Sequence, residues 1–436
     1  MKRPRKIASV LMAAILVCTC LFLTACGSGS NSSSPNPDGS GDSGTALEKV
    51  KVGVLVNDAT GTEALAFKAY YEDYCAANFN MEFVYSAQCD TAEQEVSAIE
   101  TFKTQGCKAV LSLASNDRAA QIDACASAQM YYTIVTGQLD AVQGSDGSTV
   151  DLYEQYKDNE YYLGAIGPDA DSEYNAGYEM ANDLIAQGNK TFAVWGGATA
   201  YFNEMHLMRV VGFVQAMVDN SADGATFEGA DGKDAVKGAI MEIMGGGSPA
   251  LSAGTKIGDF EIVGYFDQWD MENFSTNVAA LMDKNPDVVL TVDIGTIDLF
   301  IAYNTQNNTN IKLATFGTFC DATKSYFEGD VPSISYMQGK FASSIGANLV
   351  VVRNAVAGTT WRADDGHAMK LAQGYWGAET AEECLAYIGA DTVSNPAYSK
   401  TVLEKYMVEV NSDATYEQFA EFIGQSSYDE VQALKD

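Results

Sequence analysis

The sequence predicts an α/β protein with two doubly wound units, each built on a parallel sheet. From Glu48 onward, short apolar runs rich in β-branched residues alternate with longer segments of helical period. The alternation pauses in a loop after Val135 and then restarts, and such alternation requires parallel strands joined by right-handed crossovers. About 390 residues follow the N-terminal leader. This is more than one hydrophobic core usually organises, so two lobes are expected.

The first unit begins at Lys51–Val56, an apolar run that predicts a buried strand. Asp90 or Thr91 can open a later helix, because the side-chain oxygen of either residue can cap it. Strands are expected at 51–56, 81–85, 109–113 and 131–135, and helices at 62–77, after 90 or 91, and at 118–128.

The second unit repeats the pattern. Strands are expected at 191–195, 261–265, 288–292 and 311–315, and helices at 174–187, 205–220, 271–284 and 297–306. Residues 221–257 are rich in glycine and interrupt this unit as an insertion. The chain beyond residue 362 is predicted to be mostly helical.

The N-terminal residues predict an export signal, because four cations precede an uncharged run from Ile7 to Ala25. The sequence Leu23-Thr24-Ala25-Cys26 resembles the lipobox of bacterial lipoproteins, in which the cysteine is diacylated. That resemblance implies a signal peptide over 1–25, lipidation of Cys26 and a flexible tether over 26–47. Two acyl chains would hold the protein at the extracellular face of the bacterial cytoplasmic membrane. The alternative is an uncleaved anchor helix, because the run is close to the lower length limit for spanning a bilayer.

Charge and composition exclude several function classes. The chain has 26 Lys and Arg against 58 Asp and Glu, and loss of the signal leaves 22 cations and a net charge of −36. Nucleic acid and anionic membrane surfaces are therefore poor partners. The six cysteines after Cys26 are widely spaced and are expected to be mostly buried free thiols. His206 and His367 are the only histidines in the sequence, so neither a metal, a cofactor nor a histidine-based triad is expected.

Several blocks of this chain together resemble the type I periplasmic binding proteins of sugar-importing ABC transporters, the ribose and galactose binding group. The blocks are Glu95–Leu111, where Gly106 ends a helix before a strand, Tyr174–Tyr178, Arg209-Val210-Val211-Gly212-Phe213, Asn285-Pro286-Asp287 and Tyr336-Met337-Gln338.

The resemblance covers roughly residues 50–360 and implies two similar lobes joined by three crossing strands, with a ligand cleft between them. The crossings are expected near 165–172, 337–341 and 358–364. Lobe 1 is expected over 48–170 and 339–362, lobe 2 over 171–338, and a helical extension packed on the lobes over 363–436.

Candidate ligand contacts come from two sources. Ligand sites in open α/β sheets lie at the carboxyl ends of strands, which favours Asn57, Asp58 and Asn116. The resemblance adds the following positions: Arg209, Trp269, Asp293, Gln338 and Tyr174. In the family, the arginine reaches ligand oxygens and the tryptophan stacks on the sugar ring.

Each candidate also has a purely structural alternative. For Arg209 it is a surface ion pair, for Trp269 packing in a wall, for Asp293 helix capping and for Gln338 a structural place in the hinge. For the other four residues it is a turn or a cap.

The resemblance implies a monomeric, non-catalytic substrate-binding lipoprotein that delivers a sugar or sugar-like molecule to the permease subunits of an ABC transporter. Two departures from the family affect the ligand, because Thr136-Gly137-Gln138 and Phe316-Gly317-Thr318-Phe319 lack acidic residues that the family uses as hydroxyl acceptors. These departures make a nucleoside-binding or purine-binding lipoprotein one alternative. A ligand-sensing module for a membrane receptor is another, because the sequence does not separate transport from sensing. A cell-surface enzyme is disfavoured, because the sequence pairs no nucleophile with a base.

Overall fold

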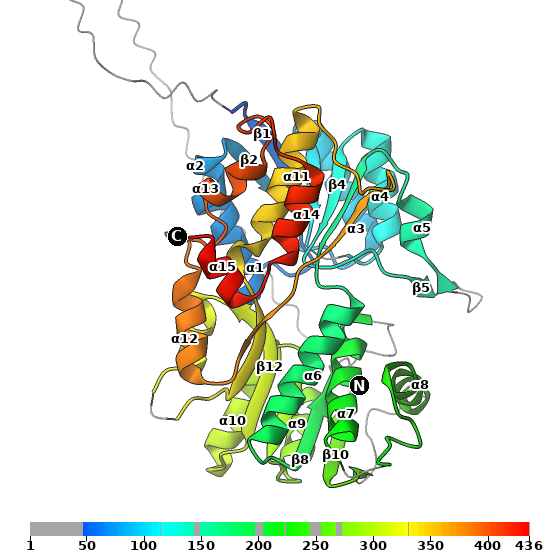
Figure 1. Cartoon of the computed structure of the whole chain (residues 1–436), viewed down its shortest axis with the longest axis vertical. Helices are drawn as coiled ribbons and strands as arrows, with labels where there is room; N and C mark the ends of the chain where they lie inside the picture. The colour runs from blue at the N-terminus through cyan, green and yellow to red at the C-terminus, as the bar shows by residue number, and fades with distance from the viewer. Residues whose placement is uncertain are drawn as a thin grey trace, which may run out of the picture. The chain divides into compact units, whose positions relative to one another are not determined.

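The computed structural model describes residues 47–113, 115–143, 149–196, 204–221, 224–244, 254–266, 273–329 and 331–435. The predicted signal, Cys26, nearly all of the tether and Trp269 lie outside these ranges. The described residues form one compact unit, which Figure 1 shows with its labelled elements. In the described ranges, no helix combines the length and the apolar character needed to cross a bilayer.

The first lobe is built on a six-stranded sheet in which every pair of neighbouring strands is parallel. Its strand order is β14 (Met369–Ala372), β7 (Tyr162–Gly167), β4 (Tyr131–Val135), β3 (Ala109–Ser112), β1 (Val50–Leu55) and β2 (Met81–Tyr85). Successive strand residues face opposite sides, so Val110 packs in one core layer and Leu111 in the other.

Helices cover both faces of this sheet. Helices α3 (Ala92–Thr104) and α4 (Arg118–Ala128) pack on one face, and α1 (Thr62–Ala69), η1 (Tyr70–Cys75), α2 (Ala76–Asn78) and α11 (Gly346–Val356) on the other. Thr91 and Asp117 cap α3 and α4, because their side chains accept backbone N–H groups that no helical carbonyl can reach. Helix α5 (Leu152–Tyr156) and the short ladder of β5 (Val142–Gln143) and β6 (Thr149–Val150) complete the lobe.

The second lobe is built on a seven-stranded sheet that is parallel except at its two edges. Its strand order is β15 (Trp376–Ala378), β13 (Tyr336–Phe341), β12 (Lys312–Phe319), β11 (Val288–Thr291), β8 (Thr191–Trp195), β10 (Phe260–Phe266) and β9 (Thr255–Ile257). The edge strands β9 and β15 are antiparallel to their neighbours.

Helices α6 (Ala170–Ala186) and α7 (Glu204–Asp219) lie on one face of this sheet, and α9 (Phe274–Met282) and α10 (Ile297–Asn307) on the other. Helix α8 (Lys233–Met244) packs on α7. The backbones of α6 and α7 approach closely at Gly177 and Gly212. A Cβ at Gly177 would come within 2.2 Å of the Arg209 carbonyl oxygen, and one at Gly212 within 2.2 Å of the Tyr174 carbonyl oxygen. The glycines in both sequence blocks are therefore required by helix packing.

The chain passes between the two sheets three times before its C-terminal helices. Passage 1 joins β7 to α6 at residues 168–169. Passage 2 leads from β13 through η5 (Ala342–Ile345) to α11, and lies around residues 341–343. Passage 3 joins β14 to β15 at residues 373–375. The first two lie near the expected positions. The third follows the expected position by about ten residues, because residues 358–364 stay beside the first lobe, where Arg362 donates to the carbonyl oxygens of Tyr162 and Asn159.

The predicted α/β class with two parallel-rich sheets is confirmed. Four predicted elements coincide with the structure, namely β2, α4, β4 and β8. Helix α6 begins four residues earlier than expected, because the Asp169 side chain caps it by accepting from the Ser172 amide. Within the expected helical extension, residues 369–372 and 376–378 instead form the strands β14 and β15. The helices that follow are α12 (Ala381–Ala390), α13 (Lys400–Leu403), η6 (Glu404–Tyr406), α14 (Tyr416–Gly424) and α15 (Tyr428–Ala433).

Candidate functional site

The carboxyl ends of the strands in each sheet face the other sheet. Strands β7 and β14 leave the first sheet at their carboxyl ends to reach the second lobe, and β13 leaves the second sheet in the same way to reach the first. Parallel neighbours share this direction, so both sheets present the edge where α/β proteins bind ligands. A set of polar side chains meets in this region. We call it the junction cluster: Glu63, Glu173, Arg209, Thr318, Lys340 and Tyr375.

Arg209 is the centre of the buried half of the cluster. Its Nε donates to Glu173 Oε2 over 2.6 Å and its Nη2 to the Tyr375 hydroxyl over 2.7 Å, while Nη1 donates to the carbonyl oxygen of Val292. The guanidinium lies 4.2 Å from the centre of the Phe316 ring. Burial lowers the pKa of Arg209, but the charge of Glu173 and the Tyr375 hydroxyl raise it by more, so its pKa lies above the ordinary value. Arg209 is therefore a fixed cation.

Tyr375 links this ion pair to passage 3. Its hydroxyl donates to Glu173 Oε1 over 2.8 Å and accepts from Arg209. Glu173 belongs to the first turn of α6, directly after passage 1. The ion pair thus connects two of the three passages to α7 of the second lobe.

The second half of the cluster joins the two lobes directly. Glu63, in the first turn of α1, accepts from Lys340 Nζ at 2.9 Å and from the Thr318 hydroxyl at 2.5 Å. Lys340 and Thr318 face each other on β13 and β12. The Lys340 side chain is only 11% exposed, whereas that of Glu63 is 39% exposed, so this ion pair lies at the edge of solvent.

Two further titratable residues lie beside the cluster in the second lobe. His206 Nε2 is 3.9 Å from Asp293 Oδ2, and Asp293 also accepts from the Gly295 amide over 2.7 Å. Burial lowers the pKa of His206 to about 4, with Arg209 and Lys340 adding to the effect and Asp293 opposing it. His206 is therefore neutral at pH 7, and its imidazole is polar without adding a cation.

The first lobe contributes Asp140, which follows β4. The residue as a whole is exposed, yet protein atoms surround its carboxylate closely. Burial raises the pKa of Asp140 to about 6, and the negative charges of Glu204 and Glu173 raise it further while Arg118 and Lys370 oppose them. Glu204 and Glu173 belong to the second lobe, so charges from across the junction act on this carboxyl group.

The predicted ligand residues fall into separate groups. Arg209 and Asp293 lie together, because the Val292 carbonyl oxygen that accepts from Arg209 immediately precedes Asp293. Gln338 is buried in β13, and its amide nitrogen lies 3.3 Å from the Tyr336 hydroxyl and 3.4 Å from Glu179 Oε2. It is therefore turned toward α6. Trp269 lies outside the described residues.

The other four candidates have local partners or solvent around them. Asn57 is exposed at the end of β1, and Asp58 accepts the amides of Thr60 and Gly61 in the turn that opens α1. Asn116 donates to the buried Glu95 and to the Cys89 carbonyl oxygen. Tyr174 packs beside Tyr178, and the ammonium of Lys233 lies 4.9 Å from its ring centre.

The remaining members of the site were not among the sequence candidates: Glu63, Glu173, Thr318, Lys340, Tyr375, His206 and Asp140. Glu173 is 36 positions from Arg209, and Glu63 is 277 positions from Lys340. No spacing rule links such pairs, because only the packing of α6 on α7 and the passages between the lobes bring them together. The position of Glu173 directly before the singled-out Tyr174 is the one local signal.

Comparisons with known proteins give a result only at the level of structure. No family model matches this chain, and no curated protein matches its sequence. The similar solved structures include a periplasmic solute-binding protein of an ABC transporter from Actinobacillus succinogenes 130z with bound D-allose. It has a TM-score of 0.53 and 12% identity, and the match covers 78% of this chain and 100% of that one.

Two further structures have comparable scores. The binding protein of the arabinose ABC transporter from Shewanella sp. ANA-3, bound to L-arabinofuranose, has a TM-score of 0.52 and 13% identity, with 78% of this chain and 95% of that chain covered. A carbohydrate transporter from Acidothermus cellulolyticus 11B in complex with myo-inositol has a TM-score of 0.50 and 14% identity. The match covers 78% of this chain and 100% of that chain. At these identities the likeness is one of fold. Together with the two parallel-rich sheets, it shows that the chain has the two-lobe fold of type I periplasmic binding proteins.

Proposed function

We propose that this protein is a non-catalytic solute-binding protein that captures a sugar or sugar-like molecule between its lobes and delivers it to the permease of an ABC transporter. The observation that carries the proposal is the junction cluster, in which charged and polar side chains from both lobes and from passage 3 meet at the carboxyl ends of two parallel-rich sheets. A ligand that contacts both lobes stabilises the closed arrangement by its difference in affinity for the closed and open states.

Polar ligand chemistry suits the cluster. Arginine has five N–H groups, of which Arg209 uses one each on Glu173, Val292 and Tyr375. Two N–H groups therefore have no acceptor among the described residues. The hydroxyl or ring oxygens of a polyol, or a carboxylate, match such donors. The solved proteins of this fold that contain D-allose, arabinofuranose or myo-inositol support a polyhydroxylated ligand.

A thermal-shift screen of the purified chain from residue 48 tests the proposal. Monosaccharides, inositols, nucleosides and amino acids form its four arms, so that the nucleoside-binding alternative is tested in the same plate. A ligand present at 100 times its Kd stabilises the folded state by about 2.7 kcal/mol. A shift in the sugar or inositol arm supports the proposal, a shift only with nucleosides replaces it by the alternative, and a flat response to all four arms contradicts it.

We also propose that the protein is a monomer anchored at the extracellular face of the cytoplasmic membrane through lipidated Cys26. The lipobox-like residues and the uncharged run before them support this. Cys26→Ala should yield unprocessed or released protein. Mass spectrometry that finds an intact Met1 terminus on the protein from its native host would contradict the anchor and leave the ligand proposal untouched.

A further inference from the structure

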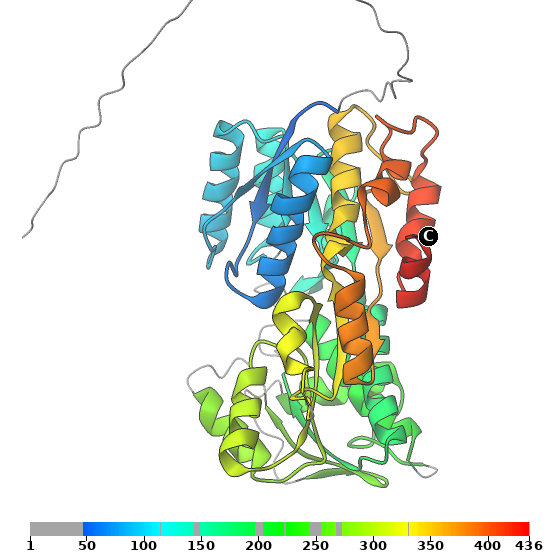
Figure 2. The same ribbon diagram turned by 90° about the vertical axis from the view of Figure 1, so that its left-hand side faces the viewer.

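The residues that follow β15 connect the two lobes again. We call residues 379–435 the C-terminal strap. Its first helix, α12, packs on β12, β13 and β15 of the second lobe, whereas α13 packs on α11 and α14 on β14 of the first lobe. Helix α15 then returns to α12, where the rings of Tyr428 and Tyr387 stack at 4.0 Å. Figure 2 shows the strap, in orange and red, beside elements of both lobes. The chain thus crosses the junction once more, between α12 and α13.

The strap is hydrogen-bonded to passage 2 at a single residue, Ser343. Asp391, at the end of α12, accepts from the Ser343 amide over 2.8 Å and from its hydroxyl over 2.6 Å. The Ser343 hydroxyl in turn accepts from the Tyr398 amide over 2.9 Å. Asp391 and Ser343 are both buried, so these bonds do not compete with water.

The strap also holds passage 3. Gln373 donates to the Tyr398 hydroxyl over 3.2 Å, and the Gly374 amide donates to the Ser426 hydroxyl over 2.8 Å. Directly after the passage, the indole nitrogen of Trp376 donates to the Ser426 carbonyl oxygen over 3.0 Å. Two of the three passages therefore have their polar groups bonded to the strap.

An aromatic cluster covers the same two passages. Phe341 from passage 2 stacks on Trp376 beside passage 3, with ring centres 4.5 Å apart and planes inclined by 13°. Tyr398 of the strap packs edge-on against Phe341 at 4.9 Å, and Tyr428 packs edge-on against Trp376 at 5.1 Å. Phe341 belongs to the second-lobe strand β13, whereas the Tyr398 carbonyl oxygen accepts from Tyr70 of the first lobe. A change in the angle between the lobes therefore strains the contact between Tyr398 and Phe341.

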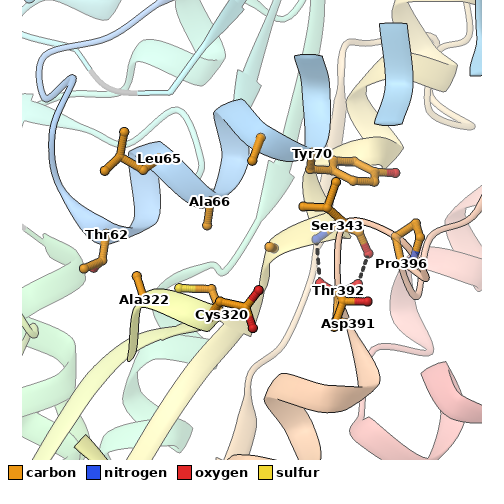
Figure 3. Close-up of a pocket in the computed structure, with 14 residues that line it drawn as sticks. Thr62, Leu65, Ala66, Tyr70, Cys320, Ala322, Ser343, Asp391, Thr392 and Pro396 are labelled. Carbon is orange, nitrogen blue, oxygen red and sulfur yellow. Dashed lines mark hydrogen bonds between the residues drawn. The ribbon is translucent and has the colours of Figure 1, made fainter. Parts of the chain in front are cut away.

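A cavity of about 210 Å³ lies where the strap crosses the junction. Figure 3 shows that its walls come from all three parts: Leu65 and Ala66 of α1 in the first lobe, Cys320 and Ala322 of the second lobe, and Thr392 of the strap. The Cys320 thiol therefore lies beneath the strap, where only 6% of the residue is exposed. The rate at which a reagent alkylates this thiol therefore reports whether the strap is packed against the junction.

We propose that the C-terminal strap is a hinge restraint that sets the angle between the lobes and limits how far they separate. The restraint is intrinsic to the chain and acts without a ligand, so it holds whether or not the proposed solute is the right one. It predicts that loosening the strap shifts the ligand-free protein toward more open lobes while each lobe stays folded.

The test compares two variants of the full chain. The loosened variant carries Ser426→Ala and Tyr428→Ala, which remove the bond to Gly374 and the stack on Tyr387. The control variant is Tyr416→Ala, in a half-buried strap residue that packs on the core away from the passages. Alkylation of Cys320 by iodoacetamide is followed by peptide mass spectrometry, with Cys107 of the first lobe as the internal reference. Small-angle scattering of the same samples gives the radius of gyration.

We expect Cys320 alkylation to accelerate about tenfold in the loosened variant. A tenfold larger open population corresponds to a change of about 1.4 kcal/mol in the free energy of opening. The rate follows that population when the strap reseats faster than the reagent reacts. Cys107 should keep its rate and the radius of gyration should increase. The proposal is overturned if the loosened variant folds but its Cys320 is alkylated at the wild-type rate. It is also overturned if Tyr416→Ala accelerates the alkylation of Cys320 equally. If the double variant does not fold, Asp391→Asn provides the same comparison through passage 2.

Discussion

Replacing Arg209 by methionine separates a structural role of this arginine from a ligand-binding one. The change keeps an apolar stem against Phe316 but removes the charge that faces Glu173. Glu173 is only 2% exposed and would keep the Tyr375 hydroxyl as its remaining side-chain donor. Breaking a buried ion pair by removing one partner costs about 3 to 5 kcal/mol, because the other charge stays buried without compensation. We expect the free energy of unfolding at pH 7 to fall by that amount.

Urea unfolding followed by tryptophan fluorescence measures this loss, with the slope against urea unchanged if the unfolded surface is the same. The double variant Arg209→Met with Glu173→Met is the matched control. It should recover much of the stability, since replacing a buried ion pair by apolar side chains is often close to neutral. A loss below about 1 kcal/mol in the single variant, or no recovery in the double variant, would refute the reasoning and leave ligand contact as the main role of Arg209.

Three other predictions concern the same region. The pKa of Asp140 rises from 3.8 to about 6 on folding, so its contribution to stability is present at pH 4 and lost by pH 7. Asp140→Asn should therefore gain stability relative to the wild type as the pH rises across that range. Urea unfolding at a series of pH values measures this gain. Glu63→Gln should lower the free energy of unfolding by about 0.5 to 1 kcal/mol, since this carboxylate is partly exposed; Glu72→Gln, whose partner Lys68 is exposed, is the control and should change little. Asn116→Ala should cost about 1 to 3 kcal/mol by leaving the buried Glu95 short of donors; a loss of ligand affinity at unchanged stability would contradict this structural assignment.

Much of the fold could be predicted from the sequence because it depends on local patterns. Strands such as β8 and helices such as α4 have an unambiguous period and clear limits. Strands β14 and β15 were missed for a physical reason. They have four and three residues, they lie at sheet edges, and β14 alternates buried and exposed residues over too short a distance to distinguish it from a loop. Their pairing is determined by distant strands, so no local pattern predicts it.

The candidate site was less predictable, since it depends on contacts between distant segments. Arg209 could be singled out because its motif contains Gly212, which the close packing of α6 and α7 requires. Its partner Glu173 could not, because the pairing arises only when those helices pack. Likewise, no local pattern distinguishes Lys340 from other polar residues of a strand. It meets Glu63 of the other lobe only because passage 2 connects the lobes next to it.

We propose that a small polar solute closes the lobes without being chemically changed. The most direct measurement is small-angle scattering of the chain from residue 48 with and without the ligand identified by the thermal screen, followed by recovery of that ligand. We expect a smaller radius of gyration with the ligand and quantitative recovery of the intact solute. An unchanged radius of gyration at saturation, or recovery of a hydrolysed or phosphorylated product, would contradict it.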